Sequence, residues 1–138
     1  MATRVLLIDD DPDIRQSVMI ALKLEGYEVI AAADAEQGYR AATIERPDLI
    51  ILDVEMPGMN GPEVLKWIRQ NPVSSRIPII FLTGRVDLEA MEETFEGEAQ
   101  GFLMKPFSPI QLLNKMEAVL RGEAPEEGSP GTATAGDA

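Results

Sequence analysis

The sequence predicts an α/β protein built on a parallel β-sheet that is covered by helices on both faces. Short apolar runs alternate five times with stretches in which apolar residues recur at helical spacing. The runs are almost continuously apolar, as expected of strands that are buried on both sides. The connections between runs and helical stretches are short, which favours a parallel sheet made of β-α-β units.

Five apolar runs predict the strands of this sheet. They span residues 4–8, 27–31, 48–52, 77–82 and 101–104. The first run, RVLLI, is followed directly by acidic residues and is typical of a buried strand.

Start and stop signals place three helices between these strands. Pro12 begins the first helix, because proline is favoured in a first helical turn, and Gly26 ends it. Asp34 can cap a second helix over residues 35–45. A third helix is predicted over residues 62–70, after a segment dense in turn formers.

Two further helices are predicted in the last third of the folded part. A short helix with a weak apolar pattern is expected near residues 88–95. Ser108 and Pro109 cap and open the last helix, which carries an apolar stripe that we expect to face the core. The stripe consists of Ile110, Leu113, Met116 and Leu120.

The order of the strands is predicted partly from what the sequence lacks. The glycine fingerprints of dinucleotide-binding and P-loop folds are absent from it. We therefore expect the flavodoxin-like (βα)5 fold, a five-stranded parallel sheet in the order 2-1-3-4-5. In such sheets the ligand site lies beyond the carboxyl ends of the strands.

The chain of 138 residues is expected to contain one folded domain and a tail. Apolar residues make up 45% of the chain, which is enough for a core within residues 1–121. Residues 122–138 contain no Val, Leu, Ile, Met or aromatic residue, but they contain three Glu and one Asp. We expect this acidic segment, rich in Gly, Ala and Pro, to be a disordered tail.

Composition excludes several classes of function. The chain has no cysteine and no histidine, which excludes disulfides, thiolate metal sites and a histidine base or metal ligand. Its net charge of −12 disfavours direct binding to DNA. No apolar run approaches the ~20 residues of a membrane span, and the N-terminus lacks the form of a signal peptide. We therefore expect a cytoplasmic protein.

Polar side chains stand where four of the predicted strands end. Asp9 and Asp10 follow the first strand, Asp53 follows the third, Thr83 the fourth, and Lys105 comes directly after the fifth. Taken singly, each has an ordinary explanation as a helix cap, a loop hydroxyl or a solvated lysine. Because the carboxyl ends of parallel strands share one edge, we expect these five side chains to meet there.

The predicted cluster suits phosphoryl chemistry. Three neighbouring carboxylates repel one another unless a cation joins them, and one lysine cannot balance three. Mg²⁺ fits such oxygen ligands, whereas no calcium-binding loop pattern is present. With Mg²⁺ bound, one carboxylate can attack a phosphoryl group and form an acyl phosphate. The metal, the lysine and the hydroxyl would stabilise the charge on the phosphoryl oxygens.

Four segments carry a resemblance to a known family. They are VLLIDDDP at 5–12, DLIILDVEMPGMNG at 48–61, IPIIFLTG at 77–84 and GFLMKPF at 101–107. Together they resemble a response-regulator receiver domain of two-component signal transduction, of the stand-alone kind found in chemotaxis regulators. The resemblance covers about residues 3–121.

The resemblance implies a role for each residue at the strand ends. Asp53 resembles the phosphorylated aspartate, and Asp9 and Asp10 resemble the acidic pair that holds Mg²⁺. The main-chain carbonyl of Glu55 is implied as a further metal ligand. Lys105 resembles the lysine that pairs with the phosphoryl group, and its peptide bond to the following proline is expected to be cis.

The resemblance also implies a conformational switch. Thr83 resembles the hydroxyl residue that bonds the phosphoryl group, and Phe102 stands at the position of the switch aromatic residue. Many members of the family have tyrosine at that position. Phe102 lacks the phenol hydroxyl that tyrosine would supply. Phosphorylation is expected to change the surface formed by the last two helices and the strand at 101–104.

The resemblance implies a signalling switch rather than an enzyme. Its phosphoryl group would come from the phosphohistidine of a histidine kinase or of a phosphotransfer protein. No DNA-binding pattern follows residue 121, so the expected output is the binding of a protein effector that the sequence does not identify, or transfer of the phosphoryl group along a phosphorelay.

Two alternatives remain at this point. A haloacid-dehalogenase-type phosphatase shares the strand-end aspartate and Mg²⁺, but Asp13 stands where its signature has Thr or Val. No aspartate lies between Lys105 and Asp137 to supply its downstream acidic pair. The second alternative is a receiver-like interaction module that is never phosphorylated. Such modules usually lose an acid or the lysine, and this chain has all of them.

Overall fold

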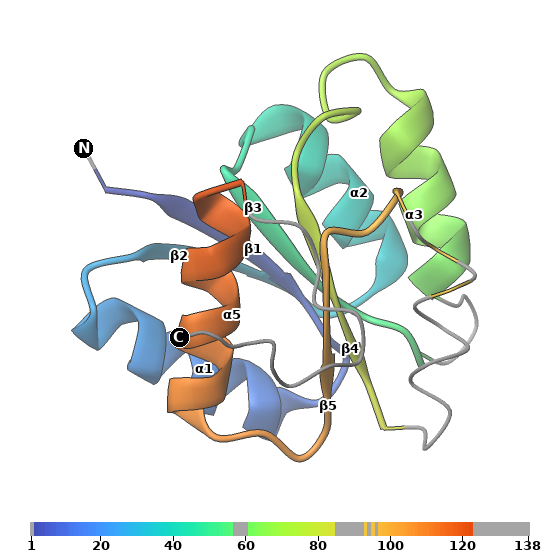
Figure 1. The fold of residues 1–138 in the computed structure, drawn as a ribbon. Coiled ribbons are helices and arrows are strands. Elements are labelled where there is room, and N and C mark those ends of the chain that lie inside the picture. Colours follow the sequence, from blue (N-terminus) through green and yellow to red (C-terminus); the bar gives the residue numbers. More distant parts are fainter. Residues whose placement is uncertain (1, 57–60, 85–92, 94, 96, 123–138) are drawn as a thin grey trace.

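The computed structural model describes residues 2–56, 61–84, 93, 95 and 97–122. Within these residues the predicted flavodoxin-like architecture is confirmed. Five parallel strands form one sheet in the order β2-β1-β3-β4-β5, and helices pack on both of its faces (Figure 1). The predicted helix near residues 88–95 lies mostly outside the described residues, and so does the predicted tail from residue 123 onward.

The helices and strands lie close to their predicted positions. The strands are β1 (Arg4–Ile8), β2 (Glu28–Ala32), β3 (Leu49–Asp53), β4 (Ile79–Thr83) and β5 (Gly101–Met104). The helices that the structure describes are α1 (Pro12–Leu24), α2 (Ala35–Ile44), α3 (Gly61–Gln70) and α5 (Pro109–Leu120). The predicted bounds of the strands are wrong by two residues at most.

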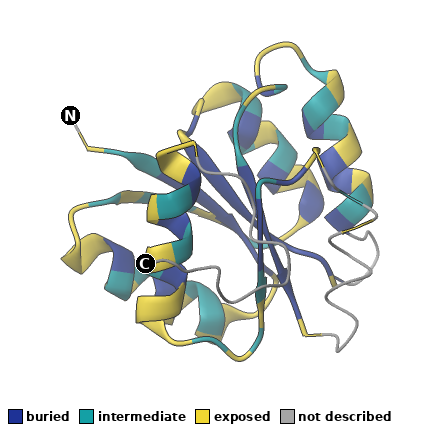
Figure 2. Ribbon diagram, viewed as in Figure 1, coloured by how far each residue is buried: buried dark blue, intermediate teal, exposed yellow. Residues whose placement is uncertain are grey.

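The side chains of the central strands alternate between two cores. On β1, Leu6 and Ile8 pack with α2 and α3, whereas Val5 and Leu7 pack with α1 and α5. β3 and β4 repeat this alternation, and all their residues are buried. Figure 2 shows the buried strands at the centre and the exposed outer sides of the helices. Two aliphatic cores thus hold the sheet from both sides.

Strand register brings the candidate residues to one edge of the sheet. Asp53, the last residue of β3, is paired with Leu82 of β4, and Thr83 is paired with Met104 of β5. Asp9 follows β1, whose last residue is level with the residue before Asp53. Figure 1 shows this carboxyl edge at the bottom of the view, where β4 and β5 end and α1 and α5 begin.

Side-chain caps fix the starts of three helices. Asp11 accepts a hydrogen bond from the N–H of Asp13 at the start of α1, and Asp34 does the same for α2. Ser108 and Gln111 form a capping box at the start of α5. The caps predicted at Asp34 and Ser108 are confirmed, and they satisfy N–H groups that have no partner within a helix.

The predicted core stripe of α5 is wrong in part. Met116 is buried and Leu113 is half-buried as expected, but Ile110 is 68% exposed and Leu120 is 36% exposed. The fully buried residues of the helix are Leu112, Met116 and Val119. Apolar residues occupy two overlapping stripes of this helix, so helical spacing alone does not determine which stripe faces the sheet.

Candidate functional site

Lys105 lies between two buried carboxylates at the carboxyl edge of the sheet. Its Nζ is 3.3 Å from Oδ2 of Asp9 and 3.3 Å from Oδ2 of Asp53. Asp9 is 0% exposed and Asp53 is 2% exposed. The three side chains continue the alternation that places neighbouring strand residues on the α1 and α5 side of the sheet.

Asp10 completes a cluster of three acids. One carboxylate oxygen each of Asp9, Asp10 and Asp53 lies within 4.8 Å of the others. Asp10 is exposed, so the cluster opens to solvent on its side. Lys105 supplies one positive charge against three negative ones. Oδ2 of Asp9 is buried, and in the described part of the chain the ion pair with Lys105 is its recorded polar contact.

The backbone after β3 holds Asp53 in place. Oδ1 of Asp53 accepts a hydrogen bond from the N–H of Glu55 at 3.0 Å. The N–H of Val54 donates to the carbonyl of Leu82 at 2.9 Å, and the carbonyl of Val54 accepts from the N–H of Gly61 at 3.0 Å. The start of α3 is therefore bonded directly to the residue that follows Asp53.

Gly61 permits this close approach. A Cβ atom at Gly61 would lie 2.7 Å from Cα of Val54 and 2.8 Å from the carbonyl oxygen of Asp53. Both neighbours are backbone atoms, which cannot rotate away. In the sequence, Gly61 stands only at the end of a segment dense in turn formers, because a contact between distant backbone segments has no signature in the pattern of apolar residues.

Asp9 is held at its backbone and at its side chain. Its N–H donates to the carbonyl of Ala32 on β2 at 3.1 Å, and its Oδ1 accepts from the N–H of Asp11 at 3.0 Å. Its carbonyl accepts from Nη1 of Arg15 at 2.8 Å. Nothing in the sequence pattern marks Arg15 as part of the site, because an arginine near the start of a helix is common and usually solvated.

Burial and neighbouring charges perturb both partners of the ion pair. Burial raises the pKa of Asp53 from 3.8 to about 6; the Glu55 N–H and Lys105 lower it, and the charge of Asp9 raises it further. Burial lowers the pKa of Lys105, but the carboxylates of Asp53 and Asp9 more than offset this, and the pKa lies above its ordinary 10.5. Lys105 is therefore charged at neutral pH, and Asp53 loses its proton only near pH 6.

Thr83 lies on the opposite side of the sheet from the charged cluster by strand alternation. It is fully buried, and it follows Ile79 and Phe81 in the alternation that faces α2 and α3. Its carbonyl accepts from the N–H of Lys105 at 2.7 Å, so β4 and β5 stay paired up to the lysine. The Lys105–Pro106 peptide bond is cis, as predicted.

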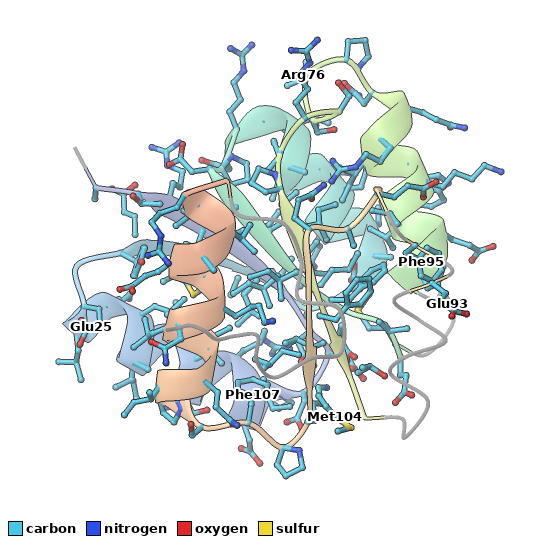
Figure 3. All side chains as sticks on the ribbon, in the orientation of Figure 1. Glu25, Arg76, Glu93, Phe95, Met104 and Phe107 are labelled. Atoms are coloured by element: carbon cyan, nitrogen blue, oxygen red, sulfur yellow. The ribbon has the colours of Figure 1, made fainter. Side chains whose placement is uncertain are left out.

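Phe102 is buried among aromatic rings. It is 5% exposed, and its ring centroid lies 5.8 Å from that of Phe81, its register partner on β4. The ring centroids of Phe81 and Phe95 are 5.3 Å apart. Figure 3 shows Phe95 near the lower end of α3 and Met104 at the end of β5. The candidate switch residue thus belongs to a row of three rings.

The structure places Glu55 beside the cluster without settling the role of its carbonyl. Its N–H binds Asp53, and its side chain is exposed. A Cβ atom at Gly84 would be 3.7 Å from Oε1 of Glu55, so the loops after β3 and β4 approach each other here. The expected contact of the Glu55 carbonyl with a metal remains a prediction.

The arrangement has two chemical capacities. Three carboxylates that outnumber their single lysine can bind a small divalent cation through hard oxygen ligands. A buried carboxylate that faces an ammonium group can act as a nucleophile, and the ammonium group can pair with the anion that results.

Comparison with known proteins assigns this site a context. The family model described as the response regulator receiver domain matches residues 5–117. The chain is 34% identical over 121 residues to the phosphate regulon transcriptional regulatory protein PhoB of Pseudomonas aeruginosa, covering 88% of this chain and 53% of PhoB. It is 36% identical over 121 residues to the DNA-binding response regulator MtrA of Mycolicibacterium smegmatis, covering 88% of this chain and 52% of MtrA. The chain thus spans about half the length of these curated relatives.

Solved structures of similar length also match. The chemotaxis response regulator CheY4 of Vibrio cholerae is 39% identical with a TM-score of 0.80, and the match covers 86% of this chain and 99% of CheY4. A CheY-like receiver domain protein from Methanospirillum hungatei is 33% identical with a TM-score of 0.78, covering 88% and 96% of the two chains. The match to the family model, over residues 5–117, includes the four residues of the cluster, Asp9, Asp10, Asp53 and Lys105.

Proposed function

Because the chain belongs to the response regulator receiver domain family, we propose that Asp53 is its phosphoacceptor. One observation carries the assignment: Asp53 is a buried carboxylate at the end of a central strand, and its Oδ2 lies 3.3 Å from Nζ of Lys105. The phosphoryl group would come from the phosphohistidine of a histidine kinase or phosphotransfer protein. The receiver domain acts as a signalling switch.

We propose Mg²⁺ as the cofactor of this site. The carboxylates of Asp9, Asp10 and Asp53, with the main-chain carbonyl of Glu55, would hold it. The charge balance supports the fit, because Asp9 and Asp53 share the single ammonium group of Lys105 and the three acids keep an excess of negative charge. When bound, the ion neutralises the charge that gathers on the phosphoryl oxygens.

The proposed transfer assigns a task to each side chain. A carboxylate oxygen of Asp53 forms a bond to phosphorus as the P–N bond of the donor breaks, and the bonding electron pair stays on the imidazole nitrogen. Lys105, already poised beside Asp53, would pair with a phosphoryl oxygen. The hydroxyl of Thr83 would donate to another.

We propose that the switch then passes through Thr83 to Phe102. Movement of Thr83 toward the phosphoryl group would leave space behind it on its own face of the sheet. Phe102 lies on the neighbouring strand, on the face that Thr83 shares by strand alternation, and its ring can change rotamer to fill that space. The surface around β5 and α5 would change with it, which a protein effector can recognise.

Protein binding is the output we favour over DNA binding. MtrA of Mycolicibacterium smegmatis is a DNA-binding response regulator, and this chain spans about half of its length. Its net charge of −12 opposes contact with phosphate backbones. Among the described residues, no helix is both long and apolar enough to cross a membrane. We propose a cytoplasmic location, where histidine kinases present their phosphohistidines.

The alternatives receive no support. The family assignment opposes a phosphatase of the haloacid-dehalogenase type. Asp9, Asp10, Asp53 and Lys105 stand together in the structure, so a module that has lost its phosphorylation chemistry is not indicated.

Labelling with acetyl phosphate and Mg²⁺ tests the proposal. Wild-type protein should gain one phosphoryl group by mass, and Asp53→Asn should gain none. Asp13→Asn, which removes an exposed carboxylate of α1, serves as the control and should be labelled like wild type. The chain has no histidine, so a label on it cannot be phosphohistidine. Equal labelling of Asp53→Asn and wild type would overturn the assignment.

The switch is tested with Thr83→Ala. This variant should still accept the phosphoryl group, because Asp53 and Lys105 are unchanged. Its phosphorylation-dependent NMR shifts at Phe102 should be much smaller than those of wild type. Shifts of equal size would remove Thr83 from the mechanism.

A further inference from the structure

Arg15 places a cation beside the acidic cluster but binds a main-chain oxygen. Its Nη1 donates to the carbonyl of Asp9 at 2.8 Å. Arg15 is half-buried, and its own N–H makes the first helical hydrogen bond of α1, to the carbonyl of Asp11 at 3.0 Å. The guanidinium group thus reaches back from α1 to the end of β1.

The carbonyl of Asp9 lies where the sheet no longer provides a partner. The register pairs of β1 with β2 and with β3 both end at Ile8. A buried main-chain carbonyl without a donor is costly. Arg15 supplies the donor from outside the sheet and so satisfies the group directly after the last paired residue.

This hydrogen bond controls the geometry between two of the acids. The peptide unit that carries the Asp9 carbonyl also carries the N–H of Asp10, and it is planar. Fixing the carbonyl therefore fixes the direction in which the chain leaves Asp9. The side chain of Asp9 is already held by the N–H of Asp11, so the peptide plane determines where the Asp10 carboxylate begins.

We propose that Arg15 is a positioning residue for the divalent-cation site. It holds the Asp9–Asp10 peptide in the orientation that brings both carboxylates to within 4.8 Å of each other and of Asp53. This inference rests on the proposed function, because it requires that the cluster binds Mg²⁺. It adds a residue that lies outside the acids, the lysine and the hydroxyl already assigned.

The direction in which Mg²⁺ affinity changes when Arg15 is removed distinguishes a positioning role from a purely electrostatic one. A positive charge close to a cation site repels the cation, so its removal would strengthen Mg²⁺ binding if charge dominated. If Arg15 acts by positioning, its removal weakens Mg²⁺ binding although a repulsive charge is lost. A purely structural role would lower the free energy of unfolding and leave the affinity unchanged.

Arg15→Met removes the charge and the donor with little change in length. Arg15→Lys keeps the charge and one possible donor. Arg4→Met is the matched control, because Nη1 of Arg4 also donates to a main-chain carbonyl, that of Glu45 at 2.7 Å. Arg4 lies at the opposite end of β1, away from the cluster.

The dissociation constant of Mg²⁺ is measured without any phosphoryl donor. Amide NMR signals of Asp9, Asp10 and Asp53 are followed as MgCl₂ is added to each variant. Removing groups that orient metal ligands typically weakens affinity about 10- to 100-fold, and we expect about tenfold for Arg15→Met, the low end, because Arg15 holds the backbone and not a ligand atom. Arg15→Lys should fall between this variant and wild type, and Arg4→Met should bind like wild type.

The outcomes are distinct. An unchanged or smaller dissociation constant in Arg15→Met would overturn the inference while leaving the proposed function intact. If Arg15→Met does not fold, Arg15→Lys decides, and a constant equal to that of wild type overturns the inference. If wild-type protein itself shows no Mg²⁺-dependent shifts, the proposed function fails and this inference fails with it.

Discussion

At the scale of single residues, Asp53 combines two opposed demands. Burial disfavours its ionised form, and its pKa is raised to about 6. The proposed chemistry requires that same ionised form as a nucleophile. The ion pair with Lys105 stabilises the ionised form of Asp53 only in part, because Lys105 also pairs with Asp9. A divalent cation would relieve the remaining excess of negative charge.

Asp53→Asn should stabilise the metal-free protein at high pH. Because the folded-state pKa is above the ordinary 3.8, the unfolded chain releases this proton first, and ionisation lowers stability as pH rises from about 4 to about 6. The Asn variant avoids this loss, which is about 3 kcal/mol for a shift of this size. Urea unfolding of both proteins without Mg²⁺ at pH 5 and pH 8 measures the gain.

The gain from Asp53→Asn should be larger at pH 8 than at pH 5, where most folded molecules keep the proton on Asp53. Asp48→Asn is unsuitable as a control, because Asp48 accepts a hydrogen bond from the N–H of Arg4. Asp13→Asn at the exposed start of α1 serves instead. A gain that does not depend on pH would contradict the assignment of the raised pKa to Asp53.

Some residues of the site could be predicted from the sequence and others could not, for a physical reason. Asp9, Asp53 and Lys105 could be predicted to meet, because each directly follows or ends an apolar run and parallel strands share one carboxyl edge. Arg15 and Gly61 act through main-chain atoms of distant segments. Such contacts depend on how closely two backbones approach, which apolar patterns do not encode.

At the scale of elements, the close approach of α3 to the end of β3 is a tight constraint beside the site. The N–H of Gly61 binds the carbonyl of Val54, and a Cβ atom has no room there. The position of α3 is thereby coupled to the backbone that carries Asp53.

Gly61→Ala should destabilise the protein and slow labelling of Asp53. The added methyl group would meet backbone atoms of Asp53 and Val54, and overpacking of this kind costs about 1–3 kcal/mol. Gly84→Ala is the control, since its Cβ atom meets only an ordinary contact at 3.7 Å. Urea unfolding and acetyl phosphate labelling are compared for both variants. A smaller loss for Gly61→Ala than for Gly84→Ala would contradict the packing argument.

The orientation of α5 shows where helical periodicity is insufficient. Its apolar residues define two overlapping stripes, and the sheet selects the one that contains Leu112, Met116 and Val119. The choice depends on the angle at which the chain enters the helix after Pro106. Sequence predicts the start of this helix through its capping box but not its rotation about its own axis.

Truncation of two α5 residues tests this orientation. Met116→Ala should lower the free energy of unfolding by about 2–5 kcal/mol, because Met116 is fully buried. Ile110→Ala should change it by less than about 0.5 kcal/mol, because Ile110 is largely exposed. Urea unfolding measures both values. Equal losses would show that the two stripes are buried to the same degree.

At the scale of the whole molecule, the sheet separates the side of the proposed chemistry from the side of the proposed switch residue. Asp9, Asp53 and Lys105 form one ion-paired group on the face that α1 and α5 cover. Phe102 belongs to the core on the opposite face, which α2 and α3 cover. The strand order and both faces of the sheet could be predicted, because buried parallel strands have nearly continuous apolar runs. Helix 88–95 and the tail remain predictions.

A chain ending at Gly122 should fold and be labelled like the full chain. Residues 123–138 contain four acids and no large apolar side chain, so they have little to contribute to a core. Thermal unfolding and acetyl phosphate labelling compare the two lengths at matched ionic strength. A lower melting temperature or weaker labelling of the shorter chain would show that the tail packs on the domain.

The position of Lys105 directly after the last strand has a consequence for protein synthesis. The ribosome makes Asp9 and Asp53 long before Lys105, and β5 joins the sheet at its edge. An emerging chain can therefore pair its first four strands while the two aspartates still lack their ammonium partner. On the proposed function, Asp53 would gain its ammonium partner only when the final strand is added, so the complete site would first exist in the finished domain.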